Sequence, residues 1–321
     1  RKRHIGRICR NSPDSMSTAC WQPSPCKETC MSADSRRSGL HVQSFRDIVT
    51  GYKAVFFDAY GVLKNHRGII PGIEATFAFL DDRDIDFYVL TNDASRSPLL
   101  LASVYTDAGL AMIGEEKIIS SGMLAREYLH NKIKSGRIAF VGTPVSAHYI
   151  DAAGFSTVAI EELDPDEADD IRAVVFLDDE GFDWEPGLNQ AINILRARNI
   201  PVIVANSDIT YPVSRNDVAV AVGAMADMVE RVVGKRFIRF GKPDAQMFNF
   251  ALDHIRGDGD PLAKTDILMV GDTLETDIMG GNHFGIDTAL VLSGNTPRRD
   301  AQLMMDATGI LPDYVCESIL E

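Results

Sequence analysis

Carboxylate, hydroxyl, amide and lysine side chains lie at the ends of short apolar runs or at predicted helix starts at several places in this sequence. Carboxylate oxygens can act as nucleophiles and are ligands that Mg²⁺ prefers, and a lysine beside them can neutralise an anionic group. Together, such side chains could bind a divalent cation and attack an anionic substrate such as a phosphate ester. The candidates are Asp58, Thr91, Asn92, Lys242, Asp272 and Asp277.

The stretch 53–63, KAVFFDAYGVL, is the clearest of these places. Residues 54–57 form an unbroken apolar run that ends at Asp58. A continuous rather than alternating run is typical of a strand that is covered on both faces in a parallel sheet. Such sheets bind ligands in the crevice beyond the carboxyl ends of their strands. We therefore expect Asp58 to lie in that crevice, and Gly61 allows the sharp turn that comes after it.

Two later apolar runs end in polar residues in the same way. Residues 86–92, DFYVLTN, end at Thr91 and Asn92, and residues 266–272, DILMVGD, end at Asp272. The sequence thus predicts three buried strands whose carboxyl ends carry polar side chains. Because parallel strands share one such edge, we expect these side chains to lie close together.

Two further candidates are placed at predicted helix starts. Lys242 lies in the tripeptide GKP that opens a helix-like segment, and Asp277 follows Asp272 by five positions. Each candidate alone has an ordinary structural explanation, such as a turn cap, a surface lysine or a helix N-terminal charge. The whole set, each member at the end or start of its own element, indicates a functional site.

The elements that would position these residues alternate between strands and helices, which predicts an α/β fold with a doubly wound parallel sheet. Residues 280–285 are expected to form a turn, and the end of the chain a short helix. The other predicted strands are 117–121 and 288–292, and the predicted helices are 71–80, 97–109 and 123–132.

About 150 positions separate Thr91 from Lys242, far more than an ordinary loop contains. This interval has its own series of strands and helices, so a second α/β unit is predicted to be inserted into the first. Its strands are expected at 137–142, 173–177 and 201–205, and its helices at 145–154, 187–198 and 222–233.

Composition excludes some classes of partner. The chain has 321 residues, 45% of them hydrophobic, and a net charge of −14. This charge argues against a nucleic acid or an anionic membrane as partner. No apolar run approaches the roughly 18 residues that a membrane helix needs, so no membrane association is expected.

Residues 1–43 are expected to form a disordered basic tail, because they are rich in Ser and Pro and lack an apolar period. Four of the five cysteines lie in it, and a zinc site is the alternative explanation for them. Their spacing contains no CxxC pair, which argues against zinc. Met16 or Met31 could also be the true start of the protein. Cys316 alone in the remainder suggests a reducing compartment, and we expect a cytoplasmic location.

The order of DAYGVL, TND, GKPDAQMF and GDTLETD resembles the haloacid dehalogenase (HAD) superfamily, whose members mostly transfer phosphoryl groups through an aspartyl-phosphate. The VL after the first glycine, TND and GKPDAQMF resemble its class IIA branch, the NagD-like and 4-nitrophenylphosphatase-like proteins. The resemblance covers about residues 52–291. It implies a Rossmann-like core at 44–133 and 237–321, with a C2-type cap at 134–236 that shields the site and sets substrate choice.

The resemblance also implies a Mg²⁺ site. Asp58 would be the nucleophile and a metal ligand, and Asp272 would be a second ligand. Asp277 would support the ion directly or through water, and the backbone carbonyl of Tyr60 would complete the set. A carbonyl ligand does not depend on the type of its side chain.

Phosphate and substrate contacts are implied for five other residues. Lys242 would neutralise the transferring phosphoryl group, and Thr91 and Asn92 would donate hydrogen bonds to its oxygens. In the inserted unit, the run ANSDITYP resembles a turn that faces the substrate in class IIA caps, which makes Asn206 and Asp208 candidates. An ordinary Asx turn explains Asn206 and Asp208 nearly as well.

Tyr60 departs from the pattern of the superfamily. Most of its phosphatases have a second Asp at this position, which protonates the leaving oxygen and later activates water. General acid–base catalysis contributes roughly 10²–10⁴-fold, and an unperturbed tyrosine is a poor base at neutral pH. Three outcomes stay open: hydrolysis of phosphates with good leaving groups only, use of another acid from the cap, or loss of hydrolysis.

The sequence therefore predicts a Mg²⁺-dependent phosphatase-type hydrolase that acts on a small phosphorylated metabolite, with a homodimer formed between caps as a further expectation. A catalytically weakened or inactive binding protein is the first alternative. A metal-independent 2-haloacid dehalogenase is the second, since DAYG also resembles the motif of those enzymes. The intact GDTLETD and the position of the insertion argue against the dehalogenase.

Overall fold

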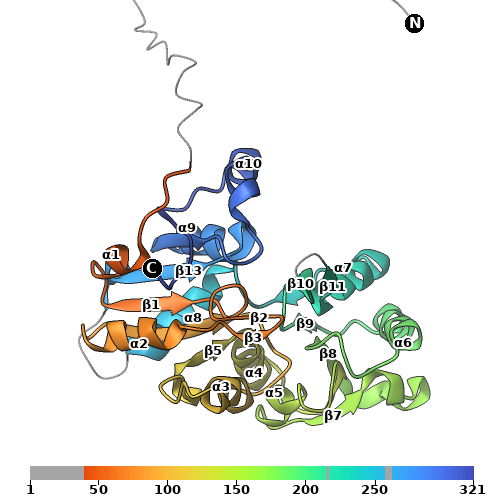
Figure 1. Cartoon of the computed structure of the whole chain (residues 1–321). Helices are drawn as coiled ribbons and strands as arrows, with labels where there is room; N and C mark the ends of the chain where they lie inside the picture. The colour runs from red at the N-terminus through yellow and green to blue at the C-terminus, as the bar shows by residue number, and fades with distance from the viewer. Residues whose placement is uncertain (1–39, 215–216, 257–261) are drawn as a thin grey trace, which may run out of the picture. The chain divides into compact units, whose positions relative to one another are not determined.

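Six parallel strands form the larger of two main sheets in the computed structural model, in the order β15-β14-β13-β1-β4-β5 (Figure 1). The structure describes residues 40–321 apart from 215–216 and 257–261, and the side chains of 165–167 and 256 are also outside it. The prediction of a disordered tail thus falls, up to residue 39, outside the described residues. The strands are β1 Ala54–Phe57, β4 Asp86–Thr91, β5 Ile118–Ser120, β13 Ile267–Gly271, β14 Asp287–Val291 and β15 Tyr314–Cys316.

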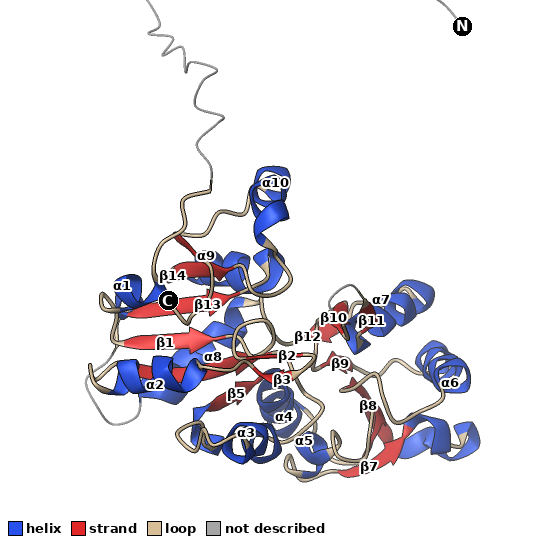
Figure 2. Ribbon diagram, in the orientation of Figure 1, coloured by secondary structure: helices blue, strands red, loops and turns tan. Residues whose placement is uncertain are grey.

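Strand β1 is buried on both faces, as its unbroken apolar run predicts. Ala54 and Phe56 belong to one hydrophobic cluster, and Val55 and Phe57 belong to another on the opposite face. Helices therefore cover both sides of this sheet, as Figure 2 shows, and the predicted doubly wound α/β fold is confirmed. The helices of this part are α1 Phe45–Val49, α2 Ile73–Asp81, α3 Pro98–Asp107, α4 Ser121–Lys132, α8 Ala245–Arg256 and α9 Met279–Phe284.

The strand order reverses at β1, which creates the crevice where such sheets bind ligands. From β1 the chain moves outward through β4 and β5 on one side, and later through β13, β14 and β15 on the other. Asp58 directly follows β1, Thr91 is the last residue of β4, and Asp272 directly follows β13. The three predicted polar ends therefore lie on neighbouring strands at one edge.

A second sheet of five parallel strands, which we call the inserted sheet, lies between β5 and α8 in the sequence, in the order β12-β9-β8-β6-β7. One face packs on α6 and α7, which Figure 1 shows on the side away from β1. Its other face shares a hydrophobic cluster with α4 and α8. The elements are β6 Arg137–Val141, α5 His148–Asp151, β7 Ser156–Ala159, β8 Ile171–Phe176, α6 Trp184–Ala197, β9 Val202–Val204, α7 Val222–Val233 and β12 Ile238–Arg239.

Strand pairing at the end of the inserted unit crosses the boundary expected from the sequence. Strand β12 pairs with β9 in the inserted sheet, although the sequence predicts that the core resumes at 237. Because the two sheets share a hydrophobic cluster, no gap in packing marks the boundary. The division into core and cap at 134 and 236 stays a prediction.

Two small hairpins complete the surroundings of the crevice. One joins β2 Lys64–Asn65 to β3 Gly68–Ile69 directly after the β1 turn. The other joins β10 Thr210–Pro212 to β11 Val218–Val220 and belongs to the inserted unit. Neither hairpin is expected from the sequence, because strands of two or three residues leave no apolar period.

The expected turn at 280–285 is wrong. Residues 279–284 form helix α9, and only Gly285 has a left-handed conformation, with φ 86°. The glycines instead allow close packing: a Cβ on Gly280 would lie 2.6 Å from the ring of Phe248, and one on Gly281 would lie 2.5 Å from the methyl group of Thr288. Glycine often signals a turn, but at these positions it serves helix packing.

The end of the chain also differs from the expected short helix. Helix α10, Arg298–Thr308, is followed by β15, which pairs in parallel with β14 at the edge of the sheet.

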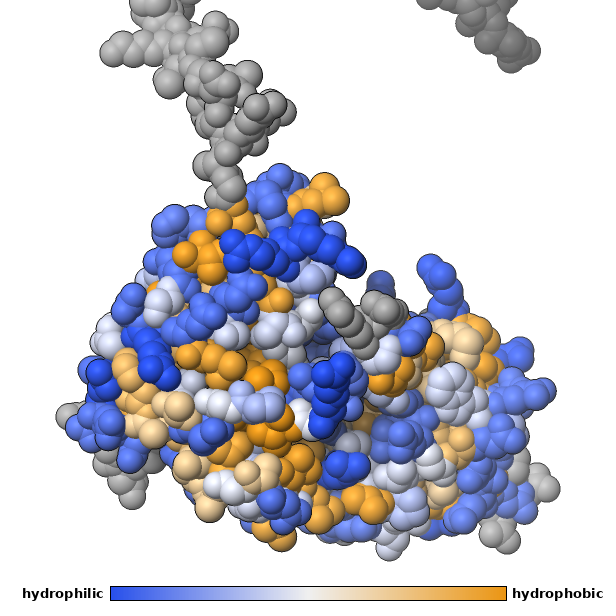
Figure 3. Space-filling view, viewed as in Figure 1, coloured by the Kyte–Doolittle hydropathy of each residue, from blue (hydrophilic) through white to orange (hydrophobic). Residues whose placement is uncertain are grey.

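Among the helices of the described residues, none is long and apolar enough to cross a membrane. On the face of the molecule in Figure 3, hydrophilic and hydrophobic residues are interspersed.

Candidate active site

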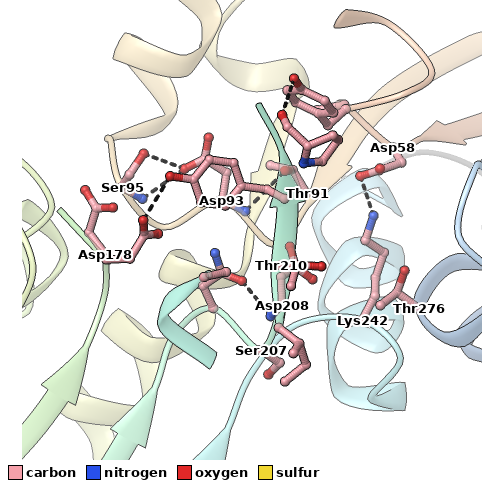
Figure 4. Close-up of a pocket in the computed structure, with 18 of the residues that line it drawn as sticks. Asp58, Thr91, Asp93, Ser95, Asp178, Ser207, Asp208, Thr210, Lys242 and Thr276 are labelled. Atoms are coloured by element: carbon pink, nitrogen blue, oxygen red, sulfur yellow. Dashed lines mark hydrogen bonds and ion pairs between the residues drawn. The ribbon is translucent and has the colours of Figure 1, made fainter. Parts of the chain in front are cut away.

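A pocket of about 860 Å³ opens where the ends of β1, β4 and β13 meet the inserted unit (Figure 4). The large sheet contributes its polar strand ends, and the inserted unit contributes the loop after β8 and the segment between β9 and β10. The lining includes side chains that can bind a ligand or take part in catalysis, namely Asp58, Tyr60, Thr91, Lys242, Asp178 and Asp208.

Lys242 lies between two carboxylates at the base of this pocket. Its Nζ is 2.5 Å from Oδ1 of Asp58 and 2.8 Å from Oδ1 of Asp277. Burial alone would lower the pKa of Lys242, but the carboxylates of Asp277 and Asp58 raise it above its ordinary value. The lysine therefore stays charged although only 2% of its side chain is exposed.

Three carboxylates gather around this lysine. One oxygen from each of Asp58, Asp272 and Asp277 lies within 4.8 Å of the others, and both Asp272 and Asp277 are fully buried. Burial raises the pKa of Asp272 well above its ordinary value, and the charges of Asp58 and Asp277 add to this. Burial also raises the pKa of Asp277 to about 7, although Lys242 opposes the rise.

The donor set fits a magnesium ion. Three acidic groups face one ammonium group, so negative charge is left over at a site where two of the three carboxylates are fully buried. Each carboxylate offers an oxygen, which is the ligand type that Mg²⁺ prefers. A bound divalent cation would neutralise the excess charge.

The local backbone brings Asp272 into place. A Cβ on Gly61 would lie 2.0 Å from Oδ2 of Asp272, and one on Gly294 would lie 1.8 Å from the same atom, so two chain segments pass the carboxylate with no room for a side chain. The backbone N–H of Asn295 donates to Oδ2 of Asp272 at 2.6 Å. The hydroxyl of Thr273 donates to Oδ1 at 2.8 Å. These contacts hold Asp272 in one orientation.

Asp277 is held by the turn in which it lies. Residues Leu274–Ile278 form a single π-helical turn, and the backbone N–H of Thr273 donates to Oδ2 of Asp277 at 3.1 Å. A Cβ on Gly271 would lie 2.2 Å from the side chain of Asp277, so glycine is needed at the end of β13. The other carboxylate oxygen of Asp277 faces Lys242.

Asn92 links three parts of the site. Its side-chain oxygen accepts from the backbone N–H of Lys242 at 2.7 Å, and its Nδ2 donates to the carbonyl of Lys242 at 3.0 Å. The same Nδ2 donates to Oδ1 of Asp208 at 2.8 Å. Both amide hydrogens are thus used within the protein. The predicted contact of Asn92 with phosphate stays a prediction, and its side chain would have to give up one of these bonds to make it.

Thr91 faces the pocket itself. Its hydroxyl oxygen accepts from the backbone N–H of Asp93 at 3.2 Å, which fixes the turn after β4. Of the two residues predicted to donate to phosphate, Thr91 is the one whose side chain lines the pocket.

The side chain of Tyr60 reaches across to the inserted unit. Its hydroxyl donates to the backbone carbonyl of Pro212, in β10, at 2.7 Å. Burial raises the pKa of Tyr60 above its ordinary value of 10.0. The phenol is therefore protonated at neutral pH and committed to a backbone acceptor.

Asn206 and Asp208 come close to the site from the inserted unit. The side-chain oxygen of Asn206 accepts from the backbone N–H of Asp208 at 2.9 Å, which is the Asx turn considered as the ordinary explanation. Asp208 extends this turn to the large sheet through its bond with Asn92. Burial raises the pKa of Asp208 to about 6. Both residues line the pocket, and their contact with substrate stays a prediction.

Several residues of the pocket were not singled out from the sequence. Asp93 accepts from the hydroxyl of Ser95 at 2.6 Å and lies 3.8 Å from the ammonium group of Lys64. Asp178 lies in the loop after β8, and burial together with the charge of Asp179 raises its pKa to about 6. Asp178 could have been found from the sequence, because it directly follows the apolar run 173–177, just as Asp58 directly follows the apolar run 54–57.

Two family models match the chain, one from β1 into the first part of the inserted unit and the other from β12 to the end. A model described as haloacid dehalogenase-like hydrolase matches residues 55–156, and one described as HAD-hydrolase-like matches residues 239–321. Between them, these regions contain Asp58, Lys242 and the buried Asp272 and Asp277.

Known proteins are similar to almost the whole of the described chain. It is 50% identical to a possible sugar phosphatase of the HAD superfamily from Cytophaga hutchinsonii, with a TM-score of 0.84 over 88% of this chain and 99% of that one. It is 28% identical to chronophin from Bos taurus over 294 residues, which are 89% of this chain and 97% of chronophin. It is 26% identical to the ribonucleotide monophosphatase NagD from Escherichia coli (strain K12) over 274 residues, 84% of this chain and 97% of NagD.

Proposed function

The chain belongs to the haloacid dehalogenase superfamily of hydrolases, in its class IIA branch, and from this premise we propose that it is a Mg²⁺-dependent phosphatase of small phosphorylated metabolites. The observation that carries the proposal is the arrangement of Asp58. Its carboxylate lies 2.5 Å from the buried Lys242 and within 4.8 Å of two further carboxylates, at the pocket end of β1.

Asp58 would act as the nucleophile. One of its oxygens attacks phosphorus, the bond to the leaving oxygen breaks, and an aspartyl-phosphate forms that water then hydrolyses. Lys242 neutralises the charge that would otherwise repel the phosphoryl group, and the side chain of Thr91 lines the same pocket and would orient it.

The metal would be held by Asp58, Asp272, Asp277 and the backbone carbonyl of Tyr60. When bound, Mg²⁺ supplies charge that screens the carboxylate nucleophile from the phosphate oxygens. The contacts of Asp272 with Thr273 and Asn295 keep its oxygens in position without rearrangement.

The pocket suits a small organic phosphate. Its volume of about 860 Å³ lies within the usual range of small-molecule sites, roughly 300–1,000 Å³. The inserted unit would act as the cap that closes over the substrate. The homodimer and the cytoplasmic location expected from the sequence stay predictions.

A panel of aryl and alkyl phosphate esters, assayed with Mg²⁺ and with a chelator, tests the proposal. We expect turnover that needs Mg²⁺ and that falls at least about 10⁴-fold in Asp58→Asn, because an amide cannot replace the nucleophile. Asp81→Asn, the same change at an exposed residue at the end of α2, serves as the control and is expected to keep full activity.

The other outcomes identify the alternatives. Turnover of a 2-haloacid that is unaffected by the chelator would support the dehalogenase. Mg²⁺ binding in calorimetry, without turnover of any ester in the panel, would support a binding protein.

A further inference from the structure

We propose that Asp208, from the inserted unit, is the general acid that protonates the leaving oxygen of the substrate. This inference rests on the proposed phosphatase function. It assigns to the inserted unit the proton transfer for which Tyr60, two residues after the nucleophile, is unsuited.

The surroundings of Tyr60 exclude it from this task. A general acid must direct its proton at the leaving oxygen of the substrate. The hydroxyl hydrogen of Tyr60 is instead directed at the backbone carbonyl of Pro212, 2.7 Å away. Tyr60 therefore connects the two sides of the pocket instead of donating a proton into it.

Asp208 is directly bonded to the framework of the reaction site. Its Oδ1 accepts a hydrogen bond from Nδ2 of Asn92 at 2.8 Å. The side-chain amide of Asn92 also makes two hydrogen bonds with the backbone of Lys242: its oxygen accepts from the N–H and its nitrogen donates to the carbonyl. Lys242 in turn contacts Asp58. Two side chains thus link Asp208 to the nucleophile.

The surroundings of Asp208 bring its pKa close to the value that suits a general acid near neutral pH. Burial raises its pKa to about 6, and the hydrogen bond from Asn92 and the charge of Lys242 reduce this rise. The other charged groups that face it, Asp58 after β1 and Asp93 after β4, raise it further. An acid with a pKa of about 6 can be protonated near neutral pH and can release the proton easily.

The other acids of the inserted unit are placed less well. In Figure 4, Asp178 lies beside Asp93 and Ser95, on the opposite side of the pocket from Asp58. The neighbouring charges that raise the pKa of Asp178 are those of Asp179, Asp93 and Glu180. Asp179 accepts a hydrogen bond from the hydroxyl of Tyr211 at 3.0 Å, which holds it against β10.

The proton balance closes over the two steps. In the first, an oxygen of Asp58 bonds to phosphorus, the bond to the leaving oxygen breaks, and the proton of Asp208 passes to that oxygen, so that an alcohol leaves. In the second, water attacks phosphorus, the bond to Asp58 breaks, and the carboxylate of Asp208 takes one proton from the water. Inorganic phosphate leaves and Asp208 is protonated again.

A comparison of leaving groups tests the proposal, with 4-nitrophenyl phosphate and glycerol phosphate as substrates for wild type and Asp208→Asn in Mg²⁺. The aryl ester leaves as a stable anion and needs no proton, whereas the alkyl ester does. We expect kcat/KM for the alkyl ester to fall about 10²–10⁴-fold in Asp208→Asn, and kcat/KM for the aryl ester to fall less than about tenfold. Retained attack on the aryl ester also shows that the variant is folded.

Time courses give a second readout that a merely structural role would not change. With the aryl ester, Asp208→Asn is expected to release a burst of one equivalent of 4-nitrophenol and then turn over slowly, because the second step also needs Asp208. With the alkyl ester no burst is expected. In wild type, kcat/KM for the alkyl ester should decline as the pH rises above the pKa of about 6, since Asp208 then loses its proton, and this decline should be absent in the variant.

Two further variants make the result decisive. Asp217→Asn, the same change in the loop that joins β10 to β11 and outside the pocket, is expected to behave as wild type. Adding Tyr60→Asp to Asp208→Asn is expected to restore at least part of the activity on the alkyl ester, because it places an acid two residues after the nucleophile.

Several results would overturn the proposal. Equal losses on both esters in Asp208→Asn, or no loss on either, would exclude Asp208 as the acid. Asp178 and Glu275 also line the pocket, and Asp208 would be excluded as well if Asp178→Asn or Glu275→Gln produced the difference between the two esters. A wild-type protein active on the aryl ester alone would show that no acid operates. No activity on either ester would refute the phosphatase function itself, and this inference with it.

Discussion

Lys242 is the residue on which the charge balance of the pocket depends. It is nearly completely buried and contacts Asp58 and Asp277, while Asp272 has no cation of its own within the described residues. Buried charges are costly unless they are paired, so the three carboxylates need more positive charge than one lysine carries. The fit to a divalent cation follows from this imbalance.

A test at the residue scale uses Gly61, which has φ 82° and lies against Asp272. In Gly61→Ala the new Cβ would lie 2.0 Å from Oδ2 of Asp272, so the carboxylate must move. We expect Mg²⁺ affinity, measured by calorimetry, to fall at least about tenfold, in addition to a backbone cost of about 1–2 kcal/mol in the free energy of unfolding.

Gly109→Ala is the matched control for this change. Gly109 has φ 86°, but a Cβ there meets nothing within 4 Å. It is expected to show the backbone cost and to keep Mg²⁺ affinity. Equal Mg²⁺ affinities for the two variants would contradict the role that we assign to the contact between Gly61 and Asp272.

Single residues also show where sequence reasoning ends. Asp58 and Lys242 could be predicted because each stands directly after or before an element with a clear apolar pattern. The bond between Asn92 and Asp208 joins positions 116 apart, and nothing in the local sequence of either residue indicates it. The contact between Tyr60 and Pro212 could not be predicted either, because these residues are also far apart in the sequence.

At the scale of elements, the β10–β11 hairpin is the part of the inserted unit that the turn after β1 contacts through Tyr60. A single hydrogen bond of this kind contributes about 1 kcal/mol, or roughly fivefold in the equilibrium constant for local opening of the hairpin. We therefore expect the hairpin to open more often when this bond is removed.

Tyr60→Phe tests this dependence. We expect faster backbone hydrogen exchange at 210–211 and 218–220, because the hairpin opens more often. Because the proposal assigns the acid to Asp208, kcat/KM for the alkyl ester should fall less than about tenfold in Tyr60→Phe. Tyr52→Phe, which removes a hydroxyl bonded to Asp287, is the control and should leave exchange in the hairpin unchanged. Unchanged exchange in Tyr60→Phe would show that its hydrogen bond does not hold the hairpin.

Elements differ in how well the sequence predicts them. Strands such as β1 and β13, and the amphipathic helix α7, carry long periodic signals, and their predicted bounds lie within one or two residues of the observed ones. The strands of the hairpins β2–β3 and β10–β11 have too few residues to show an apolar period. They form because each strand pairs with its neighbour, which the sequence pattern does not reveal. Helix α9 escapes prediction because its glycines serve close packing against Phe248 and Thr288.

At the scale of the whole molecule, metal binding and folding are expected to be coupled. The ligands come from β1 and from the segment after β13, which are brought together only when the sheet forms. A ligand that binds the folded state alone stabilises it by about 2.7 kcal/mol at 100 times its Kd. For a protein of this size we expect Mg²⁺ to raise Tm by roughly 5 °C.

Thermal unfolding with Mg²⁺ and with a chelator checks this prediction. Asp277→Asn is expected to lose most of the rise in Tm, whereas the exposed Asp81→Asn keeps it. If Mg²⁺ leaves Tm unchanged in wild type, or raises it equally in Asp277→Asn, then Asp58, Asp272 and Asp277 do not form the metal site.

Burial patterns and strand ends are local properties, so the class of the fold, the candidate nucleophile and the charged groups around it could be predicted from the order of the amino acids. The contacts among these groups are seen only in the folded protein: Lys242 with Asp58 and Asp277, Asn92 with Asp208, and Tyr60 with the backbone carbonyl of Pro212. Such contacts depend on how two sheets pack across a shared hydrophobic cluster, and packing between distant segments leaves no periodic trace in the chain.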